Sequence, residues 1–317
     1  MSTKALKKDD KIFVAGHRGL VGSSIVRRLK AEGYTNVVVR TRQELDLADQ
    51  DKVFAFLQDE KPAAVVVAAA KVGGINANNT FPADFIAQNL VIEYNLVWGS
   101  HLADVPTLMF LGSSCVYPRE TKQPIPETAL LSGPLEPTNA PYAVAKIAGI
   151  YLCDSIARQF GRRYFTAMPP NVYGPYDNFD LKTSHVLPAL IRKFHEALPD
   201  KPVEVWGSGK PRREFLHSDD VSDALVFLLN HPEVTGMVNV GTGTSVSIKE
   251  LAETVQRVVG HKGEMVWNTS MPDGFPEKTM EVTRLHDLGW HHKIELEDGI
   301  RSAYEWFKEN AAVAASK

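Results

Sequence analysis

The sequence predicts an α/β fold, with a doubly wound parallel sheet and a smaller, discontinuous α/β lobe. Three observations lead to this prediction. Short apolar runs alternate with segments whose apolar residues recur at helical spacing, which is typical of parallel strands covered by helices on both faces. A glycine cluster directly follows the first apolar run. The composition, 44% hydrophobic and 23% charged over 317 residues, is ordinary for a soluble globular chain.

The first half of the chain shows the alternation most regularly. Apolar strands are predicted at 11–15, 36–40, 63–70 and 106–114, and helices at 20–29, around 53–57 and at 90–102. In the second half, helices are expected at 142–160, 186–198 and 248–259, strands within 164–175, at 203–206 and within 236–243, and a strand with a helix in 213–230. We therefore predict a large domain from 11–176 plus 212–245, and a smaller lobe from 177–211 plus 246–310.

Charge and cysteine content exclude several classes of protein. A formal net charge of −3 gives no general reason to expect nucleic acid or a membrane surface as a partner. Cys115 and Cys153 are the two cysteines, too few for a disulfide framework or a metal cluster, so we expect a reduced, cytoplasmic protein without a metal. The N-terminal 1–11 lacks the apolar region of a secretory signal, and no apolar run approaches a membrane span. The C-terminal 310–317 reads as a frayed tail.

The glycine cluster, "AGHRGLVG", places Gly16, Gly19 and Gly22 between a predicted strand and a predicted helix. Glycines at this position let the backbone approach a pyrophosphate, and the N-terminus of the helix supplies positive potential. An ordinary tight turn is the alternative. The strand-to-helix context favours a Rossmann-type dinucleotide-binding domain.

The residues after the second strand indicate which dinucleotide binds. An NAD site usually has an acidic residue about 20 positions beyond the glycines. Here the strand ends with Arg40 and Arg42 instead, and Arg18 lies within the glycine cluster. Because arginine suits a 2′-phosphate, we predict NADP, with solvated loop charges as the alternative for Arg40 and Arg42. Asp46 is expected either at the adenine edge or as a helix N-cap.

Tyr142 and Lys146 are the candidate catalytic pair. A spacing of four places both side chains on one face of the predicted helix. An ammonium near a phenol favours the phenolate and lowers its pKa, and such a tyrosine can exchange a proton with a carbonyl oxygen during hydride transfer. Tyr-x-x-x-Lys is common by chance, but here a dinucleotide motif and Ser113, at a strand end, precede it.

Taken together, these motifs resemble the extended short-chain dehydrogenase/reductases and, within them, the GDP-L-fucose synthase family. The resemblance covers about residues 11–310. Its broad motifs are "VAGHRGLVGS", "LEPTNAPYAVAKIAG" and "NVYGP", and its narrower ones are "AAAKVGGINANNTFPADFI", "LGSSCVYP", "SHVLPALIRKFHEA" and "PDGFPEK". The resemblance implies an enzyme that converts GDP-4-dehydro-6-deoxy-D-mannose to GDP-L-fucose with NADPH, by C3/C5 epimerisation and then reduction at C4.

The resemblance also implies catalytic roles. Cys115 would be the base and His185 the acid of the epimerisation, since inverting a carbon beside a ketone needs proton transfer on two faces. Ser113 would bind the C4 oxygen, and Cys115, two positions on along an extended strand, would reach the same sugar. Tyr142 would protonate the reduced oxygen, and Lys146 would hold Tyr142 and the nicotinamide ribose. Cys153, within a helical apolar pattern, is expected to be a buried structural thiol.

The cofactor and substrate contacts follow from the same resemblance. The cofactor residues would be Gly16, Arg18, Gly19, Leu20, Val21, Gly22, Arg42, Asp46, Leu111, Ser113, Ser114, Lys146, Pro169, Asn171, Val172 and His185. The GDP-sugar would contact Asn171, Lys193, Trp206, Arg213 and Asp273, through stacking, cations for the diphosphate and a carboxylate acceptor. A core position for Trp206 and a solvated position for Lys193 are the alternatives.

Four positions depart from the family pattern. Pro170 replaces a threonine and removes its hydroxyl and N–H, and Lys193 stands where arginine is common. Phe275 replaces a smaller residue. Glu277 replaces a basic one and is expected to make the approach of a diphosphate less favourable.

The sequence also allows two other functions. A related NADP-linked nucleotide-sugar 4-reductase or a redox-neutral epimerase is the enzymatic alternative, and a catalytically silent NADP-binding protein is the alternative of a different class. A homodimer is expected, with helices near 90–102 and 142–160 pairing across a two-fold axis. The expected partners are thus a GDP-sugar and a second copy of the chain, without nucleic acid or membrane.

Overall fold

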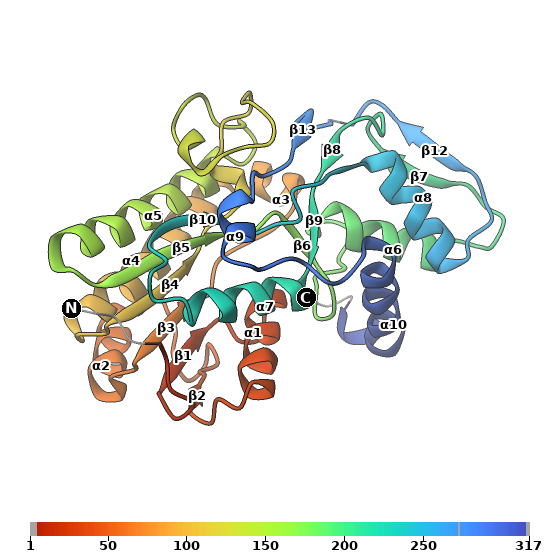
Figure 1. Cartoon of the computed structure of the whole chain (residues 1–317). Helices are drawn as coiled ribbons and strands as arrows, with labels where there is room; N and C mark the ends of the chain where they lie inside the picture. Colours follow the sequence, from red (N-terminus) through yellow and green to blue (C-terminus); the bar gives the residue numbers. More distant parts are fainter. Residues whose placement is uncertain (1–4, 272, 315–317) are drawn as a thin grey trace.

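The computed structural model describes residues 5–271 and 273–314, and it has a doubly wound parallel sheet with a second lobe beside it (Figure 1). The six strands lie in the order β10-β5-β4-β3-β1-β2, and each neighbouring pair is parallel. Their bounds are β1 (Ile12–Ala15), β2 (Val37–Val38), β3 (Ala64–Val67), β4 (Thr107–Leu111), β5 (Arg163–Met168) and β10 (Gly236–Asn239). The predicted fold class is confirmed.

Helices cover both faces of this sheet. Their bounds are α1 (Leu20–Ala31), α2 (Gln50–Glu60), α3 (Ile75–Thr80), α4 (Pro82–Leu102), α5 (Ala140–Phe160) and α7 (Ser218–Leu229), with short 3₁₀ turns η1 (Ser114–Val116) and η2 (Glu127–Ala129). Alternate residues of a strand pack on opposite faces: Phe13 belongs to the core under α2, α4 and α5, and Val14 to the core under α1 and α7. The strands are therefore buried on both sides, as their apolar runs predict.

The second lobe is a smaller layer of helices on a two-stranded parallel ladder. It contains α6 (Val186–Glu196), α8 (Ile248–Val259) and α10 (Leu296–Ala314) with β7 (Val203–Trp206) and β12 (Met265–Asn268). Its own hydrophobic core includes Leu190, Leu251 and Ile300. Helix α8 packs against both α6 and α10.

Short ladders join the two parts. The strands β6 (Asn171–Tyr173) and β9 (Phe215–His217) pair in parallel, and β8 (Arg212–Arg213) lies between β11 (Val246–Ser247) and β13 (Glu277–Lys278). Beyond β13, Met280, Val282 and Leu285 return to the cores of the large domain, the last from α9 (Thr283–Asp287). The segment 280–285 of the predicted lobe 246–310 thus packs on the sheet domain. The domain boundaries themselves stay a prediction.

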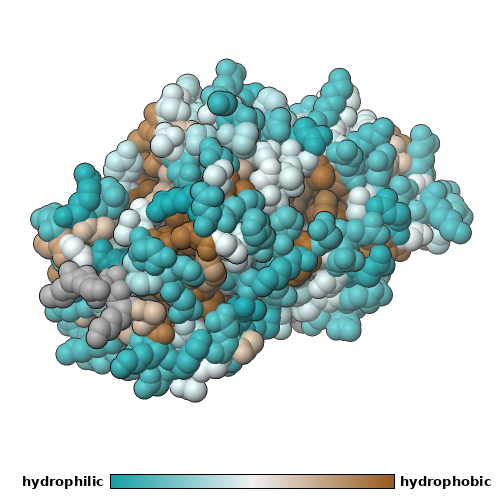
Figure 2. All heavy atoms as spheres, viewed as in Figure 1, coloured by the Kyte–Doolittle hydropathy of each residue, from teal (hydrophilic) through white to brown (hydrophobic). Residues whose placement is uncertain are grey.

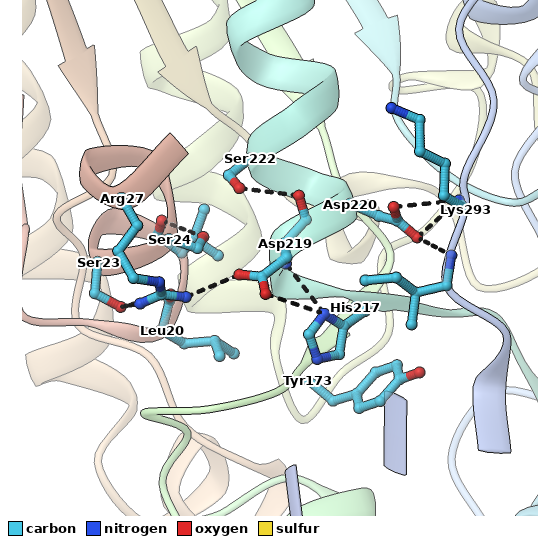
Figure 3. A network of polar contacts seen from close by, with 12 residues as sticks. Leu20, Ser23, Ser24, Arg27, Tyr173, His217, Asp219, Asp220, Ser222 and Lys293 are labelled. Atoms are coloured by element: carbon cyan, nitrogen blue, oxygen red, sulfur yellow. Dashed lines mark hydrogen bonds and ion pairs between the residues drawn. The ribbon is translucent and has the colours of Figure 1, made fainter. Parts of the chain in front are cut away.

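A polar network also ties the two parts together (Figure 3). Arg27 of α1 donates to Asp219 at 2.8 Å, and the backbone N–H of Asp219 donates to Nδ1 of His217 at 3.2 Å. On the next residue, Asp220 accepts the backbone N–H groups of Lys293 and Ile294, ahead of α10. The network fixes the first helix after the glycine cluster relative to the second lobe.

The chain ends and the surface complete the fold. Residues 310–314 of the predicted C-terminal tail continue α10, with a kink at Asn310. Residues 315–317 of that tail and residues 1–4 at the N-terminus lie outside the described residues. Among the described residues, no helix is both long and apolar enough to cross a membrane. The face in Figure 2 is mainly hydrophilic, with hydrophobic residues showing in recessed patches.

Candidate active site

A single cavity of about 1140 Å³ runs from the glycine cluster to the second lobe. It opens at the carboxyl ends of β1 and β3, where the strand order reverses, which is the usual ligand site of open α/β sheets. All of the predicted cofactor, substrate and catalytic residues line this cavity. The structure therefore brings them together, while the role of each remains a prediction.

The glycine cluster forms a cradle that a side chain would fill. Gly16 has φ +88°, and a Cβ there would lie 2.7 Å from the backbone N of Ala69. A Cβ on Gly22 would lie 2.1 Å from the carbonyl oxygen of Gly16. Gly19 is the N-cap of α1 and has no side chain to cap the first turn, so the free N–H groups of the helix face the cavity. These residues fit the pyrophosphate of a dinucleotide.

Two of the charged residues near the predicted 2′-phosphate site are already paired. Arg40 donates to Glu60 at 2.7 Å and packs over the ring of Phe56, so its charge has a partner within the protein. The Arg42 side chain is 81% exposed, 3.7 Å from Asp46. Both arginines line the cavity, and each has a carboxylate within ion-pair distance, so neither is simply a solvated loop charge. Arg18 and Arg42 are the exposed cations at this end of the cavity.

Asp46 is not a helix cap. The N-cap of α2 is Asp49, whose carboxylate accepts the backbone N–H of Lys52 at 3.2 Å. Asp46 instead accepts the N–H of Ala48 in the turn before the helix and lines the cavity. The N-cap alternative was therefore wrong, because the N-cap position of α2 lies three residues after Asp46, at Asp49.

The segment after β4 is a turn rather than a continued strand. The strand ends at Leu111, and Ser113 caps the 3₁₀ turn η1, its Oγ accepting the N–H of Cys115 at 3.2 Å. The expected strand alternation of Ser113, Ser114 and Cys115 was thus wrong. Ser114 is 1% exposed, and its N–H donates to the carbonyl of Pro169 at 3.1 Å. A local hydrogen bond from a serine favours such a turn over an extended strand.

Tyr142 and Lys146 lie on α5, one turn apart, with the Lys146 ammonium 6.0 Å from the ring centre of Tyr142. Lys146 is 2% exposed, and its Nζ contacts the carboxylate of Glu93 at 3.1 Å and the carbonyl of Leu111 at 3.0 Å. Glu93, on α4, was missed by the sequence analysis. No spacing along the chain marks it, because its partner Lys146 lies on another helix.

The electrostatic surroundings of Tyr142 differ from the expectation. Burial, with smaller contributions from Cys115 and Glu93, raises the pKa of Tyr142, and a hydrogen bond with Ser113 opposes this only in part. The predicted lowering of this pKa by Lys146 was wrong, because burial of the phenol is the largest influence on it and raises the pKa. In this state Tyr142 is a phenol, ready to donate a proton.

Lys278 brings a cation to the part of the cavity beside Cys115. Its Nζ lies 3.6 Å from Sγ of Cys115, and Lys278 is 5% exposed. His185 is exposed to the cavity at the N-cap of α6, and the desolvating walls of the cavity, followed by the charge of Lys278, lower its pKa. Lys278 is the last residue of the family motif "PDGFPEK", so the motif could have pointed to it, but the sequence analysis predicted no role for it. Pro272, the first residue of that motif, lies outside the described residues.

The far end of the cavity carries an aromatic ring and two cations. Trp206 is 45% exposed, so the core alternative for it was wrong, and the Lys193 ammonium lies 5.0 Å from its ring centre. Lys193 is half-buried, which lowers its pKa, and Nζ donates to the carbonyl of Glu204 at 3.0 Å, so it is not a freely solvated charge. Burial lowers the pKa of Arg213 to about 10, which leaves its charge intact at neutral pH.

Two acidic residues at this end are held by neighbouring groups. Asp273 accepts the N–H of Ser208 at 2.7 Å and its hydroxyl at 2.8 Å. Glu277 accepts hydroxyl hydrogen bonds from Ser245 and Thr279 and does not line the cavity. The expected effect of Glu277 on an approaching diphosphate is therefore not supported, because its carboxylate points to another partner.

The comparisons with known proteins identify the family. Residues 12–241 match the model of the NAD dependent epimerase/dehydratase family. A putative GDP-L-fucose synthase 2 of Arabidopsis thaliana is 56% identical over 96% of this chain and 94% of its own length, and a GDP-L-fucose synthase of Escherichia coli (strain K12) is 54% identical over 95% and 97%. The chain belongs to the NAD dependent epimerase/dehydratase family and, within it, to the GDP-L-fucose synthases.

A solved structure similar to this family member extends the comparison to the whole fold. It is a GDP-mannoheptose C4 reductase from Campylobacter jejuni with NADP bound, 40% identical, with a TM-score of 0.86 over 96% of this chain and 99% of that one. The matched region includes both the sheet domain and the second lobe. The cavity of this family member thus lies between two parts that recur together in a related reductase.

Proposed function

We propose that the chain converts GDP-4-dehydro-6-deoxy-D-mannose to GDP-L-fucose with NADPH, by epimerisation at C3 and C5 followed by reduction at C4. The observation that carries this proposal is the single cavity in which Cys115 and Lys278 lie beside the reductase pair Tyr142 and Lys146. A reductase alone has no need for the thiol and its neighbouring ammonium. The similarity to GDP-L-fucose synthases at 54–56% identity supports the same substrate.

The cofactor end of the cavity fits NADPH. Amides of the 16–22 loop and the N-terminus of α1 would hold the pyrophosphate, and Arg18 and Arg42 would face the 2′-phosphate. NADPH, when bound, supplies the hydride that the C4 carbon accepts. Cofactor contacts of Leu20, Val21, Leu111, Pro169, Val172 and the other predicted lining residues remain part of this proposal.

The epimerisation relies on the acidity that a C4 ketone gives to its neighbouring carbons. Cys115, as the thiolate, would remove the proton from C3 or C5, and the Lys278 ammonium at 3.6 Å favours that negative charge. His185 would return a proton to the opposite face. Because its pKa is lowered, its imidazolium is a stronger proton donor, although a minority species at neutral pH.

The reduction uses the same ketone. Ser113 would donate to the C4 oxygen, and Tyr142, kept as a phenol by its surroundings, would give that oxygen its proton. Lys146 would bind the nicotinamide ribose with the N–H that Glu93 and Leu111 leave free. At the other end, Trp206, Lys193, Arg213 and Asp273 would hold the GDP, and Asn171 the sugar.

A 4-reductase of another GDP-sugar is the second candidate, because a C4 reductase of a GDP-heptose is 40% identical over 96% of this chain. The two functions differ in proton exchange. Incubation of the 4-keto substrate in deuterated water should place deuterium at C3 and C5 with the wild-type chain. Cys115→Ser should lose this uptake while NADPH oxidation survives on a 4-keto sugar.

The same experiment can contradict the proposal. Deuterium uptake that is unchanged in Cys115→Ser would remove Cys115 from the mechanism, and no uptake in the wild type would favour the reductase. Stoichiometric NADPH consumption excludes a redox-neutral epimerase. Turnover that disappears in Tyr142→Phe excludes a catalytically silent NADP-binding protein.

We also propose a cytoplasmic homodimer. The solvent-facing sides of α4 and α5 carry exposed apolar side chains, namely Leu90, Val91, Tyr94, Leu102, Val144, Tyr151 and Phe160. Adjacent helices of this kind can pair with a second copy across a two-fold axis. Both cysteines are free thiols, in keeping with a reducing compartment. Sedimentation equilibrium showing a monomer at micromolar concentration would contradict the dimer.

A further inference from the structure

A buried carboxylate lies directly beneath the proposed reductase pair. Glu93 of α4 is 2% exposed, and its Oε1 is 3.1 Å from Nζ of Lys146. Neither oxygen has a hydrogen-bond partner among residues 5–271 and 273–314, so the contact with Lys146 is an ion pair. Lys146 is thus the counter-charge that makes burial of this carboxylate tolerable.

Helix α5 leaves space for this carboxylate at Gly149. A Cβ at position 149 would lie 2.9 Å from Oε2 of Glu93 and 2.5 Å from the ring of Phe110. Glycine in the middle of a helix destabilises it by about 0.5–1 kcal/mol relative to alanine. The absence of a side chain one turn after Lys146 therefore accommodates both Glu93 and Phe110.

Fold stability alone does not explain this ion pair. Replacing a buried pair by apolar side chains of similar volume is often neutral or stabilising. Apolar residues already surround the pair, including Phe110, whose ring centre lies 4.6 Å from Nζ of Lys146. The charges lie instead next to Tyr142, the proposed proton donor.

The reduction requires that donor in its protonated form. As the C4 carbon gains hydride, the O–H bond of Tyr142 breaks, the sugar oxygen gains the proton, and the phenolate later regains one from solvent. An uncompensated Lys146 ammonium would favour phenolate before the reaction begins. A carboxylate charge 3.1 Å from Nζ of Lys146 opposes that effect. Burial raises the pKa of Glu93, and the Lys146 ammonium acts in the opposite direction, in favour of the ionised carboxylate.

We infer that Glu93 is a positioning residue of the reductase, which fixes the Lys146 ammonium and offsets its charge so that Tyr142 stays a phenol. The inference rests on the proposed reduction at C4. Other ionisable groups also act on Tyr142. Cys115 contributes from η1, and Lys278 and Arg213 act on that thiol from β13 and β8. Phe85 of α4, against the tyrosine ring, is uncharged.

The test compares Glu93→Gln with the wild type. With NADPH and the GDP-4-keto sugar, we expect the alkaline limb of the pH–kcat profile to move to lower pH by about one unit, the usual size of a nearby charge effect. In the cofactor-free protein, the tyrosinate absorbance that Tyr142→Phe removes should likewise appear at lower pH in Glu93→Gln. The second readout needs neither substrate nor turnover.

A matched control separates this effect from loss of a buried polar group. Asn95 is 2% exposed on the same helix and donates to the carbonyl of Leu47, away from Lys146. Asn95→Ala should leave both pH midpoints where the wild type has them. If Glu93→Gln does not fold, Glu93→Asp, whose shorter side chain withdraws the charge from Nζ, should move both midpoints in the same direction by a smaller amount.

Unchanged midpoints, or midpoints at higher pH, in the folded Glu93 variant would overturn the inference. Failure of the proposed function has a different signature. In that case the wild type does not oxidise NADPH with the 4-keto sugar, and the tyrosinate titration still decides the role of Glu93.

Discussion

Replacing Gly22 by alanine tests whether the 16–22 loop is the dinucleotide cradle. The new Cβ would lie 2.1 Å from the carbonyl oxygen of Gly16, whereas the shortest ordinary carbon–oxygen contact distance is about 3.3 Å. The loop and the first turn of α1 must therefore separate by about 1 Å. Both contacting groups are backbone, so no flexible side chain can move aside.

The displacement has a cost in stability and in binding. Overpacking destabilises by about 1–3 kcal/mol, and the helical preference of alanine returns about 0.5–1 kcal/mol. An amide moved by about 1 Å leaves hydrogen-bond range of a phosphate oxygen, and one such charge-assisted bond contributes about 1.5–3 kcal/mol. We therefore expect NADPH affinity to fall by about 10- to 100-fold.

The assay is a fluorescence titration of NADPH, with thermal unfolding followed in parallel. Gly161→Ala is the control: Gly161 has φ +68° after α5, a Cβ there meets no atom within 4 Å, and the residue does not line the cavity. It should lose about 1 kcal/mol of unfolding free energy through backbone strain, without a change in NADPH affinity. Unchanged affinity in folded Gly22→Ala would refute the cradle.

Three further predictions follow from the site. Arg42→Ala should reduce the preference for NADPH over NADH about tenfold or more, whereas Arg40→Ala should leave it unchanged, because Arg40 is paired with Glu60. The ratio of kcat/KM for NADPH to kcat/KM for NADH measures this preference in each variant. A thiol reagent should modify Cys115 in the native chain but Cys153 only after unfolding, since Cys153 is 1% exposed and burial raises its pKa. Mass spectrometry of the labelled peptides measures this, and labelling of Cys153 in the native chain would contradict the structure. Lys278→Met should raise the pKa of His185, because the Lys278 ammonium disfavours the imidazolium and is absent from the variant. The resonance of His185, identified as the one that His185→Gln removes, should titrate at higher pH by NMR. A lower midpoint would contradict this.

The glycine cluster shows how much local sequence can predict. Strand, glycines and helix are contiguous, so residues 12–31 are enough to predict that a nucleotide site begins there. The surroundings of Arg40, in contrast, cannot be predicted from local sequence. Glu60, which neutralises Arg40, is 20 residues away along the chain and reaches it only after α2 has packed on the sheet.

The segment from Ser113 to Cys115 was predicted as a strand end because apolar residues precede it. The structure has a 3₁₀ turn, since the side chain of Ser113 hydrogen-bonds the N–H of Cys115 and the N–H of Ser114 finds the carbonyl of Pro169. The local bond is within reach of sequence reasoning. The contact with Pro169 is not, because it depends on the alignment of β4 with β5.

The sequence by itself determined the fold class, the dinucleotide loop and the types of residue available for catalysis, because these depend on periodicity and on spacings of a few residues. Tertiary structure decided which charges face each other. The Lys146 ammonium meets Glu93 from another helix, and the Cys115 thiol meets Lys278 from 163 residues away. The protonation of Tyr142 depends first on its burial and then on such charges, and both are set only when distant parts of the chain pack together.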